Sequence, residues 1–197
     1  IVHHTIQTTG IVQDFGDLES EVASITFDIV ALTFSGTFRY WRLSHFTGHF
    51  DSQKRLMIGN WDLYTGTGGT GTNYPEGTAD ANTWTVGSNT YTADASHLFS
   101  STYAFWKPFD ANQNNTFWWN LGQTGDLTGA NTWLEIDLGT ARTIQSVAIS
   151  HGQQTYSFTG CKLFGSATGA FSGEETEVAD FTGLLQPWAS NDRFVLG

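Results

Sequence analysis

Two carboxylates stand at a spacing that acid–base chemistry could use. Glu135 and Asp137 are separated by one residue, so both would project from the same face of a strand. Paired carboxylates hydrolyse glycosidic bonds when they flank a substrate in a pocket. Leu134, Ile136 and Leu138 alternate with these carboxylates and indicate that the opposite face of the strand packs against the core. We therefore interpret both carboxylates as solvent-facing, and keep a hydrolase as a third alternative.

Nucleophilic and metal chemistry have no recognisable pattern in the chain. Cys161 is the single cysteine, so a disulfide within the chain is excluded, and we expect a buried small apolar side chain there. The six histidines are scattered, and none forms a metal-binding spacing such as H-E-x-x-H. We predict that the protein is not an enzyme.

Aromatic side chains in loops suggest a different chemistry, the stacking of sugar rings. The chain has eight Trp, six Tyr and 15 Phe, and we expect Trp41, Trp118 and Trp133 to serve the core. Loop residues that could contact a ligand combine ring faces with polar anchors. These candidates are Trp84, Tyr103, Trp106, His151, Gln153, Tyr156 and Trp188.

Charge restricts the partners of the protein. Nineteen acidic residues against eight basic ones give a formal net charge of −11, which repels phosphate backbones and anionic lipid surfaces. We expect no nucleic-acid partner. The residues Ile1–His4 do not begin a signal peptide, and no apolar run is long enough to span a membrane, so we expect no membrane insertion.

The elements that must position these residues are strands. Many aromatic residues and Thr, with 22 Gly and three Pro, suit pleated sheets joined by tight turns, and predict an all-β fold. Alternation of apolar and polar residues is the main signal. Predicted strands occupy residues 25–34, 37–44, 56–64, 134–138, 147–149, 161–163 and 193–196, with short strands in 82–92 and loops over 104–122 and 169–183.

The stretch 65–73 is rich in Gly and Thr and has no apolar anchor. We expect it to be flexible, because its residues cannot offset the entropy of ordering. A phosphate-binding loop is disfavoured, since no Lys-Ser/Thr pair follows. It divides the chain into N-terminal strands (1–64), a linker (65–79) and a core (80–197).

Three motifs in this core resemble the discoidin, or coagulation factor 5/8 type C, family. They run from Pro108 to Trp118, from Thr132 to Gly139 and from Lys162 to Ser166, in the order in which that family has them. The resemblance covers about residues 80–196. It implies a galactose-binding-like jelly-roll β-sandwich, a fold whose members bind ligands without catalysis.

The strands that normally end this family stand first in this chain. Phe38–Leu43 is similar to its penultimate strand and Ile58–Tyr64 to its last strand. Either one sandwich is circularly permuted, or the tail of one module precedes most of another. We favour one continuous permuted sandwich, since neither half alone would close its sheets.

The resemblance also implies a calcium site, because many members of the family wrap Ca²⁺ in the loop after the Phe-Asp pair. Carried over to this chain, the oxygen ligands would come from Asp110, Asn112, Asn115, Thr116 and Asn60. Two departures weaken the match. Ala111 replaces the glycine of the tight turn, and Asn60 replaces a glutamate.

Two functions follow as expectations. In the first, the chain is a non-enzymatic virion structural protein, such as a phage tail, fibre or capsid-decorating component, that contacts other virion proteins or itself as a homo-oligomer. A Tyr-Trp-Arg strand followed by a Gly-rich segment and a discoidin-like core is typical of such proteins, as the resemblance implies. In the second, it is a glycan-binding adhesion module. Either function places the protein in a virion or outside the cell.

Overall fold

The computed structural model describes residues 32–48, 56–97, 101–110, 118–120, 130–152, 156–185 and 192–197; for 118–120 it describes the backbone alone. The described strands all lie in one compact unit, Ala31–Gly197, and the other unit, Ile1–Val30, lies outside the described residues. The predicted strand at 25–34 therefore lies mostly outside them, and its last three residues, 32–34, are not in a strand.

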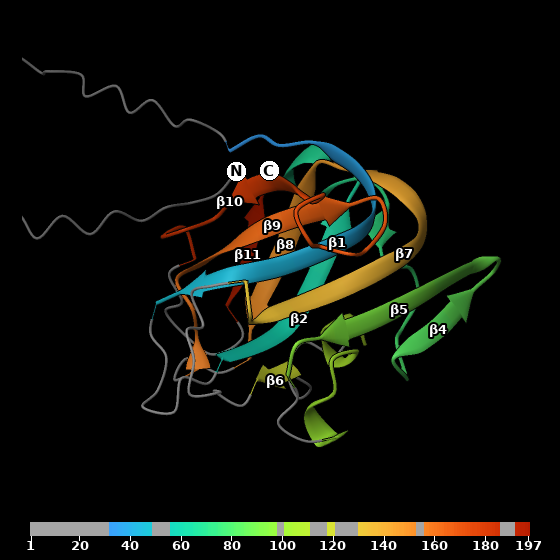
Figure 1. Cartoon of the computed structure of the whole chain (residues 1–197), viewed down its shortest axis with the longest axis horizontal. Coiled ribbons are helices and arrows are strands. Elements are labelled where there is room, and N and C mark those ends of the chain that lie inside the picture. The colour runs from blue at the N-terminus through green and yellow to red at the C-terminus, as the bar shows by residue number, and fades with distance from the viewer. Residues whose placement is uncertain are drawn as a thin grey trace, which may run out of the picture. The chain divides into compact units, whose positions relative to one another are not determined.

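The described residues form eleven strands and three short 3₁₀ helices (Figure 1). No described helix has the length and hydropathy needed to cross a membrane. The strands are β1 (Gly36–Thr47), β2 (Leu56–Tyr64), β3 (Asn73–Tyr74), β4 (Thr83–Val86), β5 (Asn89–Ala95), β6 (Trp118–Asn120), β7 (Trp133–Ile144), β8 (Ser146–His151), β9 (Gly160–Ser166), β10 (Thr176–Asp180) and β11 (Arg193–Leu196), and the helices are η1 (Thr67–Gly69), η2 (Ser101–Tyr103) and η3 (Lys107–Phe109).

The strands form two antiparallel sheets, which confirms the predicted all-β sandwich. Sheet A has the order β10-β9-β1-β7-β5-β4. Sheet B has the order β11-β8-β2-β3, and β6 also pairs with β2. The two N-terminal strands are thus internal to the sheets: β1 lies between β7 and β9, and β2 pairs with β8, β3 and β6.

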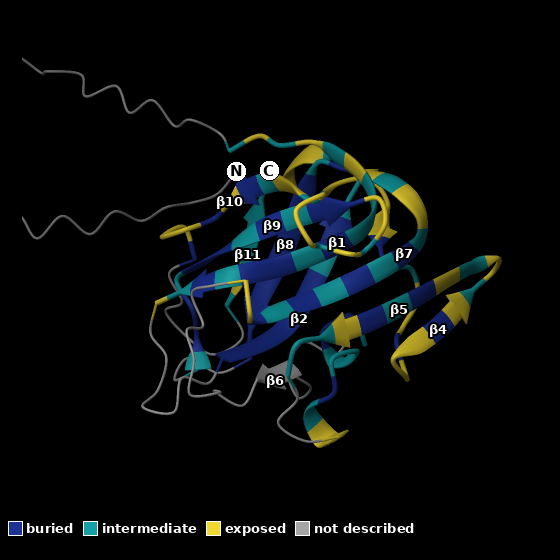
Figure 2. Cartoon of the chain, viewed as in Figure 1, coloured by how far each residue is buried: buried dark blue, intermediate teal, exposed yellow. Residues whose placement is uncertain are grey.

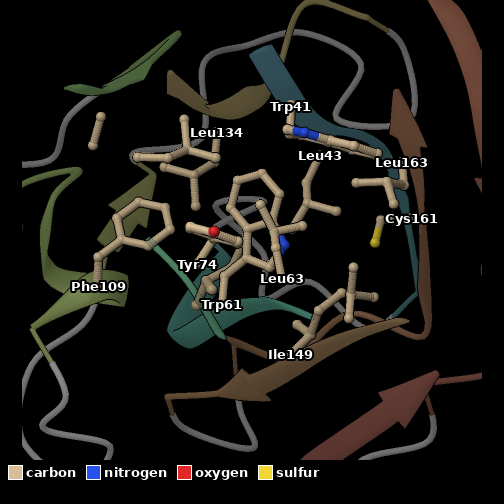
Figure 3. Packing of buried hydrophobic residues seen from close by; sticks show 14 of the residues in the cluster. Trp41, Leu43, Trp61, Leu63, Tyr74, Phe109, Leu134, Ile149, Cys161 and Leu163 are labelled. Carbon is tan, nitrogen blue, oxygen red and sulfur yellow. The ribbon is translucent and has the colours of Figure 1, made fainter. Parts of the chain in front are cut away.

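The core forms where the inner faces of the two sheets meet (Figure 3). Sheet A contributes Trp41, Leu43, Leu134 and other alternating residues, all fully buried. Trp61 and Leu63 contribute from β2 of sheet B. Burying one such side chain stabilises the fold by about 1.5–3 kcal/mol relative to its exposure. Figure 2 shows the resulting alternation of buried and half-buried residues along β1 and β7.

Cys161 lies on β9 within this core and is fully buried, as the sequence predicts. Burial disfavours the charged thiolate and raises the pKa of the thiol far above its usual range. The side chain therefore acts as a small apolar group and is unreactive.

The Gly- and Thr-rich stretch 65–73 differs from the flexible segment expected from its composition. Its backbone forms a closed loop, because the Thr65 N–H donates to the Thr72 carbonyl at 3.1 Å and the Gly66 N–H donates to the Thr70 carbonyl at 3.0 Å. Ser146 on β8 donates to the Gly66 carbonyl and accepts from the Gly69 N–H. Hydrogen bonds to the neighbouring strand replace the apolar anchors that the sequence lacks.

Candidate functional site

The outer face of sheet B carries an open depression of about 200 Å³, which we call the Asp62 depression. Its polar side chains come from β2, β3 and β11, and its apolar wall comes from the turn after β3 and from η3. The polar residues are Asn60, Asp62, Tyr64, Asn73 and Arg193, and the wall includes Pro75 and Phe109.

A β-bulge turns the polar residues of β2 outward. Ile58 pairs with His151 and Asn60 pairs with the adjacent Ser150, so Gly59 is an extra residue on β2. The bulge changes which alternate positions face the core: Ile58 is buried before it and Trp61 after it. As a result Asn60, Asp62 and Tyr64 share the outer face, while Trp61 packs against Phe109 with ring centroids 5.7 Å apart.

Asp62 is the centre of the hydrogen-bond network in the depression. Its Oδ2 accepts from Asn60 Nδ2 at 2.6 Å, and its Oδ1 accepts from Asn73 Nδ2 at 3.0 Å. Tyr64 donates its hydroxyl to Oδ2 at 3.4 Å. Arg193 Nη2 lies 3.2 Å from Oδ2 and donates to the Tyr64 hydroxyl at 2.7 Å. The carboxylate therefore holds four side chains in fixed orientations.

Small residues on β8 allow Arg193 to reach Asp62. Strand β8 lies between β11 and β2, so the arginine must cross it. On the outer face of β8, Ser150 pairs with Arg193 and Ala148 pairs with Asp62. Both residues are fully buried. Side chains of this size leave room for the guanidinium to lie over the strand.

The depression presents hydrogen-bonding groups suited to hydroxyl groups. Asn60 and Asn73 direct their amide nitrogens to Asp62. Asn73 is exposed, so its oxygen can accept a hydrogen bond from a ligand, whereas Asn60 is 5% exposed. Burial and the neighbouring Asp62 carboxylate raise the pKa of Tyr64, so its hydroxyl stays protonated. The charges of Asp62 and Arg193 offset one another. This combination suits an uncharged ligand with several hydroxyl groups.

Two of the aromatic residues predicted to bind a ligand, Trp84 and His151, are buried. Trp84 is 6% exposed, packs against Phe109 and donates its indole N–H to the Glu76 carbonyl, so its ring faces are inside the core. His151 is fully buried. Such rings present no face to a sugar, because neighbouring side chains already cover them.

The other predicted ligand residues are less buried. Tyr103, Trp106 and Tyr156 are half-buried, and the Lys107 ammonium lies 4.1 Å from the centroid of the Trp106 ring. Gln153 and Trp188 lie outside the described residues. None of the five described candidates lines the Asp62 depression.

The calcium ligands implied by the resemblance are described in part. Asn60 is 5% exposed and lines the depression beside Phe109, which directly precedes Asp110. Asn112, Asn115 and Thr116 lie outside the described residues. Within the described ranges no three Asp, Glu, His or Cys side chains form a metal-binding group.

The nearest carboxylate to Asn60 does not fit a cation site. Asp62 is neutralised by Arg193, and the group that Asn60 directs toward it is the amide nitrogen. Ca²⁺ requires oxygen ligands. The described residues therefore do not make a calcium site by themselves, and calcium binding remains a prediction from the resemblance.

Glu135 and Asp137 are both paired with arginines of β1. Asp137 accepts from Nε and Nη2 of Arg39, both at 2.7 Å. Glu135 accepts from Arg42 Nη2 at 2.6 Å, and Arg42 lies between the rings of Trp133 and Phe171. The sequence predicts solvent-facing carboxylates, but the side chains of Asp137 and Glu135 are only 18% and 13% exposed. It could not predict the arginine partners, because the pairs join residues more than 90 positions apart.

Sequence reasoning missed most of the depression. The sequence does contain one signal: Asn60, Asp62 and Tyr64 alternate with Trp61 and Leu63, which places the three on one face of the strand, away from the core. Arg193 has no such signal, because it reaches Asp62 only through the order of strands in sheet B.

Comparisons of the chain with protein-family models, with curated proteins and with solved structures find no match.

Proposed function

We propose that the chain is a non-enzymatic recognition domain, a galactose-binding-like jelly roll with permuted strand order, and that the Asp62 depression binds an uncharged glycan. One observation carries the proposal. A single carboxylate orients two amides, a tyrosine hydroxyl and an arginine around an open depression. Sugar hydroxyls are recognised by such fixed donors and acceptors, with an apolar wall beside them.

The absence of net charge in this network favours a neutral ligand. Among the described residues that line the depression, the only charged pair is Asp62 and Arg193, and the whole chain carries a formal charge of −11. A sialylated or sulfated glycan would be repelled by the overall field. The paired state of Glu135 and Asp137 supports a binding function over hydrolysis, because an ion-paired carboxylate is a poor proton donor or acceptor.

Replacing Asp62 tests the proposal. Asp62→Asn keeps the shape of the side chain but loses the charge that orients its neighbours, so we expect binding of neutral glycans to weaken roughly tenfold or more. The measurement is binding to an array of neutral, sialylated and sulfated glycans. Asp94→Asn is the matched control, since Asp94 is an exposed aspartate on β5 of sheet A. Binding that is unchanged in Asp62→Asn would contradict the assigned site.

A second candidate function is a structural protein of a virion, with contacts to other virion proteins or to further copies of itself. The described sheets leave β4 and β10 at the two edges of sheet A, and open edge strands can pair with another chain. Light scattering after size exclusion tests this function. A strictly monomeric species at high concentration would contradict self-association.

A further inference from the structure

The outer face of sheet A is hollowed where β7 bends away from β1. Phe38 pairs with Arg142 and Tyr40 pairs with Asp137, so four residues of β7, 138–141, stand opposite Arg39 alone. A bulge of this kind bends its strand and re-aims nearby side chains, and bulges are common beside binding sites. The result is an open depression of about 300 Å³, which we call the Arg39 depression.

Gly139 allows the bulge to form. Its φ of +73° lies in the left-handed region, which L side chains rarely adopt. A Cβ at this position would also lie 2.6 Å from the carbonyl oxygen of Thr90 on β5. The glycine that ends the Thr132–Gly139 motif therefore brings the backbones of β5 and β7 together in the lining of the depression.

Hydroxyl groups dominate the lining. Ser88, Thr90 and Thr92 come from the β4–β5 turn and from β5, and Thr140 comes from the bulge. Asn89 also lies in the lining, but its amide nitrogen donates to Glu76 at 3.4 Å and its oxygen accepts from Arg142 at 3.3 Å. The Thr90 and Thr92 hydroxyls already hydrogen-bond to the Thr85 and Thr83 hydroxyls at 3.3 and 3.2 Å. Each keeps further hydrogen-bonding capacity, because a hydroxyl has one donor and two acceptor lone pairs, so the set still matches a ligand that carries several hydroxyl groups.

The charged side chains among the described lining residues, Arg39 and Asp137, again form a pair. Arg39 uses Nε and Nη2 to bind both carboxylate oxygens of Asp137, and its side chain remains 43% exposed. Bidentate pairing fixes the plane of the guanidinium. A carboxylate or phosphate ligand would have to compete with Asp137, whereas a neutral hydroxyl group can accept from the guanidinium without displacing it.

We propose that the Arg39 depression is a second binding site for uncharged saccharides, on the face of the sandwich opposite the Asp62 depression. The ligand class rests on the proposed function, and the location rests on the bulge and its lining. Two sites on opposite faces would let one molecule bind two glycan chains at once.

The test removes hydroxyl groups without changing shape. Thr90→Val with Thr92→Val is nearly isosteric, and valine favours strands, so the fold should be retained. The probes are methyl β-galactoside, methyl α-mannoside and N-acetylglucosamine, each titrated at millimolar concentration into the isotope-labelled full chain. Amide chemical shifts locate the binding, and unfolding in urea checks the stability of each variant. Asp62→Asn serves as the matched control at the other face.

We expect at least one probe to shift amides of residues 88–92 and 137–140, with about tenfold weaker binding in the double valine variant and unchanged binding there in Asp62→Asn. Shifts confined to residues 60–64, 73 and 193 would overturn the second site and leave the proposed function intact. Shifts confined to the Arg39 depression would support the second site and contradict the first. A lack of shifts with all three probes would overturn both.

Discussion

His151 shows what burial does to a titratable residue in this fold. Its Nε2 donates to the Phe158 carbonyl at 2.9 Å, and its ring packs against Phe158 and Phe194. Its Nδ1 is buried without a hydrogen-bond partner in the described structure. Burial lowers the pKa of His151 to about 4, although Asp192 and the bonded carbonyl act in the opposite direction. The imidazole is therefore neutral in the folded state at neutral pH.

This shift predicts a loss of stability in acid. The unfolded histidine has a pKa of about 6.5, above that of the folded state, so the unfolded chain binds the proton first as the pH falls. Stability should be highest above pH 6.5 and should fall by about 3 kcal/mol between pH 6.5 and 4. Urea unfolding across this range measures it. A His151→Gln variant with the same dependence on pH would contradict the assignment to His151.

Asp62 is a second residue whose side chain determines its surroundings. One side chain orients four neighbours, and three of these, Asn60, Asn73 and Arg193, lie on different strands. The sequence singled out Asn60 through a resemblance to a calcium ligand. In the structure Asn60 donates a hydrogen bond to Asp62, so this residue belongs to the hydrogen-bond network of the depression.

Strands β1 and β7 are joined by a mostly buried ion pair. The side chains of Arg42 and Glu135 are 14% and 13% exposed, and the guanidinium carbon lies 4.2 Å from the ring centroid of Trp133 and 3.7 Å from that of Phe171. Burial raises the pKa of Glu135, while Arg42 lowers it. Removal of one partner would leave a buried charge uncompensated.

We therefore expect Arg42→Met to destabilise the fold by about 3 kcal/mol or more, and expect Arg42→Met combined with Glu135→Leu to recover most of that loss. Chemical denaturation of the two single variants and the double variant gives the coupling energy. Additive effects of the two substitutions would show that the pair does not act as a unit.

The sequence predicts elements best where alternation is strong. The aliphatic alternation at Leu134, Ile136 and Leu138 locates β7, and the patterns at 37–44 and 56–64 locate β1 and β2. Strand β10 lies within the segment 169–183, which the sequence predicts to be a loop. It has no apolar alternation to reveal it, because Ala179 is its one buried residue and its pairing with β9 shifts register just before that residue. The depressions depend on bulges at Gly59 and opposite Arg39. Gly59 and Gly139 are sequence signals for a bulge, but a glycine alone does not show how the pairing register shifts.

At the scale of the molecule, the N-terminal strands complete sheets that the C-terminal region begins. Strand β1 contacts β7 and β9 along nearly its full length, and β2 is the main partner of β8. Trp41 and Trp61, both fully buried, come from these two strands. A chain that starts at residue 80 would expose the internal edges of both sheets and lose the core side chains of β1 and β2, including both of these tryptophans.

We expect the fragment 80–197 to lack cooperative unfolding, and expect 31–197 to unfold in one transition. Circular dichroism during thermal unfolding compares the two fragments. Adding a peptide of residues 31–79 to the shorter fragment should restore structure, because it supplies both missing strands. Cooperative folding of 80–197 alone would indicate that the N-terminal strands belong to a separate module.

Two polar depressions on opposite faces, each built around an Asp–Arg pair, give the whole molecule its proposed character as a binder of neutral glycans. The Asp62 depression is the central claim. Its most direct test is the binding of neutral glycans at this depression, followed by the amide shifts of residues 60–64, 73 and 193 and compared between the native protein and Asp62→Asn. The account predicts binding by the native protein that weakens roughly tenfold or more in the variant. Equal binding by both proteins, or no binding by the folded native protein, would contradict it.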